Sequence, residues 1–375
     1  MYVLKFPKIA NLQQSQHTDK KPVILIGVLD WGLGHASRMV PLIHYLLQTQ
    51  CQILIAATGP QRKLLELEFP SLQFLSPPEY GVKYKKGKRK LVFGLIRQLP
   101  RLFQIITTER EWIRRISKLY DLDIIISDNR YGMRDNQIFS VIITHQLAPI
   151  TGMGAVIDQI IGKLHASYLN YFNQIWVPDL EQKGLAGKLS HTGLVSKKLK
   201  YIGPVSRFEK TFNYTIKPGH LLVMLSGPEP NRSLFEELLL EQLLSYKGSY
   251  TLVRGLPMST EALPNSINHA DALTLQALIQ EAQYIICRSG YTSVMDLLKL
   301  GKTALLVPTP GQTEQEYLAN YLDKEGLFIH APEKGFTLSS EVERLRNFRP
   351  QFPKINFSQF KSVLDKLIEE IKTKD

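Results

Sequence analysis

A histidine directly follows two closely spaced glycines, where an apolar run gives way to a helical pattern. The segment is Gly32-Leu33-Gly34-His35. Glycines allow a tight turn, and the free N–H groups and positive dipole end of the next helix favour an anionic ligand. Histidine titrates near neutral pH, so His35 could take a proton from a substrate hydroxyl. The alternative is a histidine that caps its own helix.

The glycine loop does not complete the fingerprint of a dinucleotide-binding site. Such a site requires a third glycine, where this chain has Ser37, and an acidic residue after the second strand, where the run at 53–59 has none. We therefore do not expect a nicotinamide cofactor.

A polar cluster, Asp128-Asn129-Arg130, directly follows the apolar run at 124–127. An aspartate at the C-terminal end of a buried strand often reaches a ligand cleft. Asp128 could hold one tautomer of His35 and raise its basicity. The alternative is a turn residue whose carboxylate bonds its own backbone. We favour the functional interpretation because the cluster follows a buried strand.

Two further loops lie between a strand and a helix and contain small residues. The run Cys287-Arg288-Ser289-Gly290-Tyr291-Thr292 has the free N–H groups that suit a phosphate. The loop at 226–232 includes Gly227 and Arg232, and this arginine could pair with a pyrophosphate. A solvated surface arginine is the simpler alternative. We place Arg254, the last residue of the strand predicted over 250–254, in the same phosphate-binding group.

Glu314 and Gln315 open a predicted helix that follows the strand at 303–307. A carboxylate can accept hydrogen bonds from two neighbouring sugar hydroxyls, and an amide can both donate and accept. Thr313 as the N-cap and Glu316 at the third helical position would form a capping box. Both interpretations can hold together.

The densest run of positive charge lies at 83–90, before an apolar helical pattern at 91–106. Basic residues beside an apolar helical face suit an anionic membrane surface, and a core helix after a solvated basic loop is the alternative. We predict a core helix for the apolar part and membrane contact for the basic part. No nucleic-acid partner is expected, since no recognised module appears. The basic residues are Lys83, Lys85, Lys86, Lys88, Arg89 and Lys90.

Two parallel sheets are needed to position these loops. Apolar strands alternate with helical patterns from residue 23 to residue 177, and the alternation restarts at 221. Continuous apolar strands separated by helices indicate parallel sheets covered on both faces. The predicted fold class is α/β, with two Rossmann-like domains facing a central cleft. We divide the chain into a polar tail at 1–21, a first domain at 22–205, a linker at 206–218, a second domain at 219–356 and a C-terminal helix at 357–375.

The bulk composition fits this division. The 375 residues suffice for two domains, and 46 Lys and Arg against 34 Asp and Glu give a net charge of +12. This balance favours phosphorylated ligands, anionic membranes or nucleic acid without choosing among them. Cys51 and Cys287 are expected to be buried free thiols. Neither a signal peptide nor a transmembrane helix is predicted, which indicates a cytoplasmic protein.

Taken together, the loops resemble a known family. The loop at 32–35, the run Cys287-Arg288-Ser289-Gly290, and Glu314-Gln315 with Asn320 are similar to the GT-B glycosyltransferases of family 28. A member of that family is the lipid-linked N-acetylglucosaminyl transferase of peptidoglycan synthesis, and the diacylglycerol glycosyltransferases are relatives. The resemblance spans residues 22–330 and is strongest in the last third of the chain.

The resemblance implies an acceptor-binding first domain and a second domain that binds a nucleotide sugar. It implies transfer without a metal or cofactor and with inversion at the anomeric centre, with His35 as the base. Thr144-His145-Gln146 looks like a second acceptor-side segment beside Gly32 and Gly34. On the donor side, the family's phosphate loop matches Ser289 and Gly290, and its ribose and sugar pair matches Glu314 and Gln315. The other donor-side residues that we predict are Gly227, Arg232, Arg254, Arg288 and Thr292.

The sequence therefore predicts a glycosyltransferase that moves a hexose or N-acetylhexosamine from a nucleotide diphosphate sugar, UDP-linked by resemblance, to a lipid-linked or glycan hydroxyl. Arg232 or Arg288 would neutralise the departing diphosphate, and the protein would contact the inner face of the membrane peripherally. Two alternatives stay open. One is a nucleotide-sugar hydrolase or epimerase on the same fold, which would consume donor without acceptor. The other is a non-catalytic protein that binds sugar nucleotides or membranes.

Overall fold

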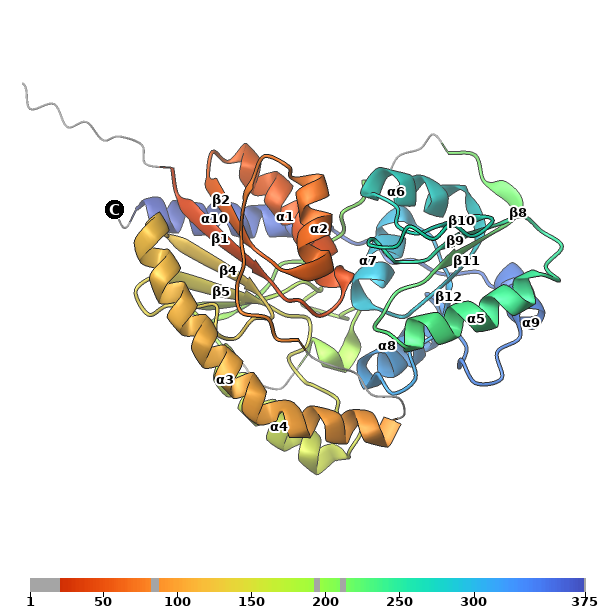
Figure 1. Cartoon of the computed structure of the whole chain (residues 1–375), viewed down its shortest axis with the longest axis horizontal. Coiled ribbons are helices and arrows are strands. Elements are labelled where there is room, and N and C mark those ends of the chain that lie inside the picture. The colour runs from red at the N-terminus through yellow and green to blue at the C-terminus, as the bar shows by residue number, and fades with distance from the viewer. Residues whose placement is uncertain (1–20, 82–87, 192–195, 210–213, 374–375) are drawn as a thin grey trace, which may run out of the picture.

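The computed structural model of the protein describes residues 21–81, 88–191, 196–209 and 214–373, and for residues 88–99 only the backbone. Within these residues the chain forms two parallel sheets, each flanked by helices (Figure 1). The predicted α/β class, with two Rossmann-like halves, is confirmed.

The first sheet has the strand order β3-β2-β1-β4-β5-β6-β7, with all neighbours parallel. The order reverses between β1 and β4, where Val28 and Asp128 are register partners. Loops diverge at such a switch point and leave a crevice for ligands. The fold thus brings the first glycine loop and Asp128 to one edge. The strands are β1 Val23–Val28, β2 Gln52–Ala56, β3 Gln73–Leu75, β4 Ile124–Asp128, β5 Phe139–Ile143, β6 Gln174–Val177 and β7 Leu199–Tyr201.

The second sheet has the order β10-β9-β8-β11-β12-β13 and is also parallel. Its switch point lies between β8 and β11, so the loops that begin at residues 225 and 288 meet at its edge. The strands are β8 Lys217–Met224, β9 Tyr250–Val253, β10 Ser266–Ile267, β11 Ala282–Cys287, β12 Leu305–Leu306 and β13 Ile329–His330.

Helices connect the strands of both sheets. The apolar pattern at 91–106 lies within α3, which is 33 residues long. The helices are α1 Leu33–Gln48, α2 Gly59–Glu68, α3 Lys88–Tyr120, α4 Ala155–Leu169, α5 Asn231–Leu243, α6 Ala272–Glu281, α7 Tyr291–Leu300, α8 Thr313–Lys324, α9 Leu338–Asn347 and α10 Gln359–Lys372, with a 3-10 turn at Gly187–Leu189.

The mostly apolar run at 201–205 looks like a strand in the sequence, but only its first residue lies in one. It belongs to β7, which ends at Tyr201, although the next four residues are buried. Gly203 has a φ of +73°, and Pro204 has no N–H to donate, so the ladder cannot continue.

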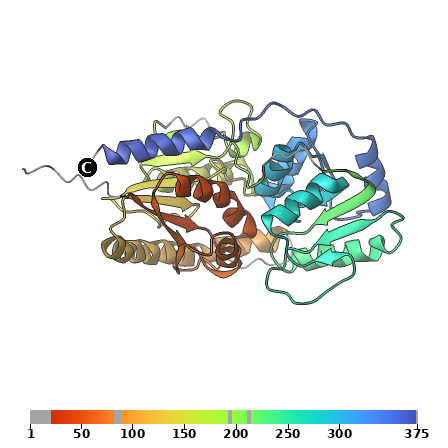
Figure 2. The ribbon, with the colours of Figure 1, turned by 90° about the horizontal axis from the view of Figure 1, so that it is seen from above.

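The C-terminal helix α10 returns from the second sheet to the first. Phe360, Leu364 and Leu367 are buried in the same core as the apolar residues of α1 and β1. The Tyr45 hydroxyl donates to the Asp365 carboxylate at 2.7 Å and ties α10 to α1. Figure 2 shows α10 lying along the first domain, far in sequence from its partners. The last helix therefore completes the core of the first domain.

Both cysteines are buried free thiols, as predicted. Among the described residues, no helix is long and apolar enough to cross a bilayer.

Replacing Leu364 with Ala should lower the free energy of unfolding of the first domain by about 2–4 kcal/mol, because a fully buried leucine leaves a cavity under α1. Chemical denaturation followed by circular dichroism measures the loss. Leu244, which is 89% exposed, provides the matched control, and Leu244→Ala should change stability by less than about 0.5 kcal/mol. Equal effects of the two changes would contradict the packing role of α10.

Candidate active site

The switch-point loops of the two sheets meet at the N-termini of α1 and α7. Gly32 caps α1 with a φ of +96°, which favours glycine. The Thr292 hydroxyl donates to the Gly34 carbonyl at 3.0 Å, and a Cβ on Gly34 would lie 3.0 Å from that hydroxyl oxygen. Gly34 therefore permits close approach of the two domains, and Thr292 contacts the first domain.

His35 lies against the buried carboxylate of Asp128. The distance from His35 Nδ1 to Asp128 Oδ2 is 2.8 Å, and the other carboxylate oxygen accepts from Arg38 Nε at 2.6 Å. Asp128 is fully buried at the end of β4, whereas the His35 side chain is 16% exposed. The structure thus places the two predicted catalytic residues in direct contact.

Charge and burial shift the acidities of this pair. Burial lowers the pKa of His35, Asp128 opposes this by attraction, and Arg38 lowers the pKa further. Burial would raise the pKa of Asp128, but Arg38 and His35 outweigh it, so the pKa lies below its usual value. At neutral pH the pair is a neutral imidazole beside a carboxylate.

The second acceptor-side segment reaches across to the second domain. His145 Nε2 lies 2.6 Å from Glu314 Oε1, and the Gln146 amide donates to the other oxygen of Glu314. The His145 ring stacks on Tyr291 with centroids 4.2 Å apart. Glu314, predicted on the donor side, therefore takes its hydrogen bonds from the acceptor side in this structure. Burial would raise the pKa of Glu314, but the interaction with His145, together with those with His35 and Arg38, lowers it.

Gln315 and Ser289 hold the loop before α8. The Gln315 side chain accepts from Thr309 N at 2.9 Å and donates to Gln312 Oε1 at 2.6 Å. The Ser289 hydroxyl donates to the Gln315 carbonyl at 2.9 Å. These two predicted donor-side residues thus lie together and bond within the second domain.

The capping box predicted for α8 is wrong. Gln312 is the N-cap, and Thr313 is the first helical residue, whose hydroxyl donates to the Ile150 carbonyl in the first domain. Glu316 accepts from Gly311 N at 3.0 Å. The Thr313 hydroxyl therefore forms a hydrogen bond across the domain interface and does not cap its own helix.

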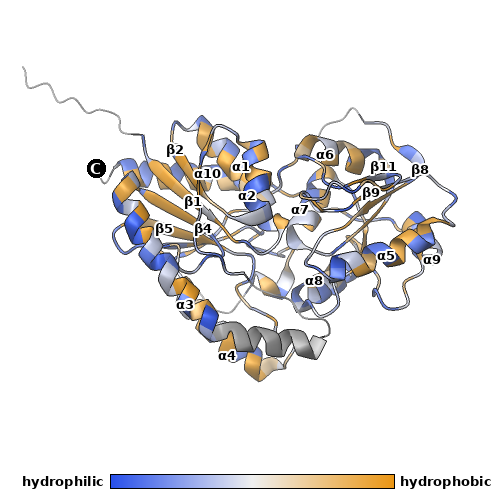
Figure 3. Cartoon of the chain, viewed as in Figure 1, coloured by the Kyte–Doolittle hydropathy of each residue, from blue (hydrophilic) through white to orange (hydrophobic). Residues whose placement is uncertain are grey.

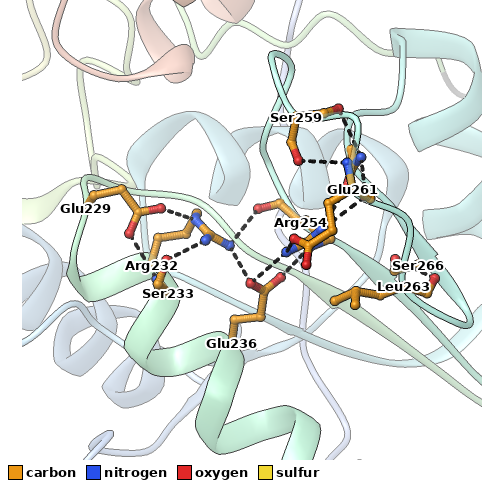
Figure 4. A network of polar contacts seen from close by, with 10 residues as sticks. Glu229, Arg232, Ser233, Glu236, Arg254, Ser259, Glu261, Leu263 and Ser266 are labelled. Atoms are coloured by element: carbon orange, nitrogen blue, oxygen red, sulfur yellow. Dashed lines mark hydrogen bonds and ion pairs between the residues drawn. The ribbon is translucent and has the colours of Figure 1, made fainter.

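Arg232 and Arg254, both predicted on the donor side, pair with carboxylates inside the second domain. Both are about 5% exposed and share the carboxylate of Glu236, at 3.1 Å and 2.6 Å (Figure 4). Arg232 also pairs with Glu229 at 2.6 Å, and Arg254 with Glu261 at 3.0 Å. Of these carboxylates only Glu236 is buried, so both arginines help to balance its charge.

Arg288 is also buried and paired with a carboxylate. Its side chain is 1% exposed, pairs with Glu333 at 2.6 Å and lies over the Phe235 ring at 4.1 Å. It also donates to the Val307 and Asn231 carbonyls. Both arginines predicted to neutralise a diphosphate thus have carboxylate partners in this structure.

In the second domain, backbone N–H groups and one buried hydroxyl are available to bind an anion. Gly227 has a φ of +105° in the loop before α5, and Gly290 caps α7 with open space beside its Cα. A Cβ on Gly227 would lie 3.6 Å from the Thr309 hydroxyl, which is buried and has no hydrogen-bond partner in the described part of the chain. The arrangement can take an oxyanion through N–H groups and Thr309.

Sequence reasoning missed Arg38 and Thr309. Arg38 stands one helical turn after His35, a spacing that places both side chains on one face of α1. Thr309 stands between two prolines in the loop after β12. Among the described residues, no group of three or more His, Cys, Asp or Glu side chains is arranged to hold a metal ion.

Comparison with known proteins gives one family and a set of relatives. Residues 266–369 match the family model described as the glycosyltransferase family 28 C-terminal domain. A protein of Methanosarcina acetivorans, named an uncharacterized glycosyltransferase, is 24% identical over 81% of this chain and 84% of its own length. The UDP-N-acetylglucosamine--N-acetylmuramyl-(pentapeptide) pyrophosphoryl-undecaprenol N-acetylglucosamine transferase of Syntrophus aciditrophicus is 34% identical over 20% of this chain and 21% of its own.

Solved structures of low identity share the fold. The glycotransferase of kitacinnamycin has a TM-score of 0.63 at 14% identity, covering 94% of this chain and 96% of its own. The spinosyn rhamnosyltransferase complexed with thymidine diphosphate has a TM-score of 0.58 at 15% identity, with the same coverage.

Replacing Arg254 with Met should destabilise the second domain by about 3 kcal/mol, because it leaves the buried Glu236 carboxylate with a weaker partner. Chemical denaturation measures the loss. The control Arg346→Met removes an exposed ion pair with Glu343 and should cost less than about 0.5 kcal/mol. If Arg254→Met kept full stability yet lost nucleotide binding, the result would show that Arg254 binds the donor nucleotide.

Proposed function

We propose that this chain, a glycosyltransferase with the GT-B fold and a family 28 C-terminal domain, transfers a sugar from a nucleotide diphosphate donor to a hydroxyl group of an acceptor. One observation carries the proposal: His35 is paired with Asp128 at 2.8 Å, one residue from the contact between Gly34 and Thr292 at the N-terminus of α7. A base and an anion-binding helix end thus meet at one interface, as transfer between two substrates requires.

His35 is the proposed base. When its Nδ1–H donates to Asp128, the Nε2 nitrogen carries the lone pair. The lowered pKa keeps the ring neutral at physiological pH, so that it is ready to accept a proton. Asp128 then stabilises the imidazolium that forms.

The donor would bind the second domain through the N-termini of α5 and α7. Gly227, Gly290 and the Thr309 hydroxyl, which has no hydrogen-bond partner among the described residues, are the groups proposed to bind the diphosphate. Glu314 and Gln315 are the proposed ligands of sugar and ribose hydroxyls. Glu314 would exchange its bonds from His145 and Gln146 for bonds from the donor.

The reaction follows from this placement. The acceptor hydroxyl gives its proton to His35 while its oxygen forms a bond to the anomeric carbon. The bond from that carbon to the phosphate oxygen breaks on the opposite face, so the configuration is inverted and the nucleoside diphosphate leaves. In the proposed metal-independent mechanism, fixed helix N–H groups stabilise the charge of the leaving group. Closure of the domains would exclude water and limit hydrolysis.

The proposed donor is a UDP-linked hexose or N-acetylhexosamine. The name of the Syntrophus aciditrophicus relative specifies UDP-N-acetylglucosamine, and a relative from Streptococcus uberis carries the same name at 26% identity. The name of the Syntrophus protein also specifies a lipid-linked acceptor, which supports such an acceptor here.

Replacing His35 with Ala should lower the rate of transfer at least about a hundredfold and leave donor binding intact, because the base is lost and the second domain is untouched. Turnover is measured with radiolabelled UDP-sugars and membrane extracts, and binding by thermal shift against a panel of nucleoside diphosphates and their sugars. The matched control His44→Ala changes an exposed histidine of the same helix and should retain turnover.

Other outcomes would lead to different conclusions. Near-normal turnover of His35→Ala would remove the base assignment. Consumption of donor at the same rate without acceptor would indicate a hydrolase. Absence of any nucleotide-dependent shift in the intact protein would contradict the nucleotide-sugar donor.

A membrane-facing surface would suit a lipid-linked acceptor. Val156, Ile160 and Leu164 stand one helical turn apart on α4 and are 70%, 61% and 40% exposed. Phe103 of α3 stacks on Tyr168 of α4, so the two helices lie side by side, and Figure 3 shows hydrophobic residues along them. We include peripheral contact with an anionic membrane in the proposal, supported by this stripe.

The basic residues predicted to contact the membrane lie just before α3 and in its first turn. Lys83, Lys85 and Lys86 fall outside the described residues, and the side chains of Lys88, Arg89 and Lys90 do too, although their backbone begins α3. The α4 stripe, which the described residues do contain, therefore provides the test.

The double change Val156→Ser and Ile160→Ser should reduce sedimentation with vesicles of anionic phospholipid at least about threefold, because it removes exposed apolar area from the proposed contact. Vesicle co-sedimentation at fixed salt measures it. The matched control Leu244→Ser removes a leucine that is 89% exposed on the second domain. Unchanged sedimentation of the double variant would exclude α4 from the contact.

A further inference from the structure

The guanidinium group of Arg38 connects three groups from three parts of the first domain. Arg38 is 4% exposed and lies one helical turn after His35 on α1. Its Nε donates to Asp128 Oδ1 at 2.6 Å, its Nη1 lies 3.0 Å from His145 Nδ1, and its Nη2 lies 2.8 Å from His35 Nδ1. Among the described residues, its polar partners are the Asp128 carboxylate and the two histidine nitrogens.

These contacts determine where the proton of His145 lies. Arginine has only donors, and among the described residues no acceptor competes for His145 Nδ1, so this nitrogen accepts from Arg38 and carries no proton. With Nδ1 accepting, the N–H of the ring is on Nε2, which donates to Glu314 Oε1 at 2.6 Å. Arg38 thus fixes the tautomer that points a proton at the second domain.

For His35, Arg38 and Asp128 approach the same nitrogen. A proton on Nδ1 satisfies Asp128 Oδ2, which has no other hydrogen-bond donor among the described residues. Without that proton, Oδ2 would be a fully buried carboxylate oxygen with no hydrogen-bond donor among the described residues, which is unfavourable for a charged group. Arg38 Nη2 has Asp128 Oδ1 as a second partner and loses little. The favoured tautomer therefore leaves Nε2 of His35 without a proton.

We propose that Arg38 is a positioning residue for sugar transfer: it turns one oxygen of Asp128 toward His35, keeps His35 free to accept a proton on Nε2, and directs the proton of His145 to Glu314. This inference rests on the proposed function and concerns a residue that does not itself touch either substrate.

The charges around His35 support this role. The groups that face it are Arg38 on α1, Asp128 on β4, His145 after β5 and, from the second domain, Glu314 on α8. Burial and Arg38 lower the pKa of His35, and Asp128 raises it. Removing the charge of Arg38 while Asp128 stays would raise the pKa of His35. A base that must be unprotonated would then become active only at higher pH.

The test compares Arg38→Met with Arg38→Lys. In Arg38→Met, the acidic limb of the pH profile of kcat/KM should move upward by about one pH unit or more, and kcat at pH 7 should fall about tenfold or more. Arg38→Lys keeps the charge and loses the forked geometry, so its acidic limb should stay within about 0.3 units of the parent while kcat still falls. A purely structural role would lower the rates of both variants without moving the limb of either.

A second measurement needs no turnover. Histidine labelled with ¹³C at Cε1 reports the pKa of His35 by NMR, assigned through His35→Gln. The pKa should rise in Arg38→Met and stay unchanged in the matched control Arg62→Met, which removes an arginine of α2 paired with Glu66. An unchanged pKa in Arg38→Met would overturn the role of Arg38 even where His35 is the base, whereas an active His35→Ala variant would overturn the base assignment alone.

Discussion

The buried carboxylate of Asp128 is the group on which the arrangement of the interface depends. It lies at the end of β4 without solvent contact, so its charge must be balanced by its neighbours. Arg38 and His35 provide that balance from one face of α1, which fixes α1 relative to the first sheet. Through Arg38 the same charge reaches His145, and through His145 it reaches Glu314 of the second domain. One chain of polar contacts therefore joins the two sheets at their switch points.

Much of the fold follows from patterns in the sequence, because a buried parallel strand must be apolar along its whole length and a helix must repeat near 3.6 residues. The runs at 23–29 and 124–127 match β1 and β4 closely for this reason. The predictions are wrong where a contact or a backbone conformation in the folded protein outweighs the local sequence pattern. Pro204 ends a ladder that its apolar neighbours would have extended, and the Thr313 hydroxyl turns to the first domain in preference to its own helix.

Only part of the candidate active site could be predicted from the sequence. A histidine after a glycine loop and an aspartate after a strand can be located because their positions are fixed by the edge of the sheet. The ion-pair partner of an arginine cannot be predicted in this way, because its long side chain can reach carboxylates that are distant in the sequence. Arg232, Arg254 and Arg288 point inward to carboxylates that follow them by 4 to 45 positions in the chain or precede them. Arg38 carries no motif of its own, and its importance is visible only when Asp128 and His145 stand beside it.

The return of α10 to the first domain makes the second domain an insertion between β7 and the last helix. Two chain crossings therefore join the halves, so a cut at a single linker cannot separate them into complete units. During synthesis on the ribosome, the first domain emerges early but lacks Phe360, Leu364 and Leu367 until the end of the chain is made. The core of the first domain is therefore complete only after the whole second domain has been synthesised.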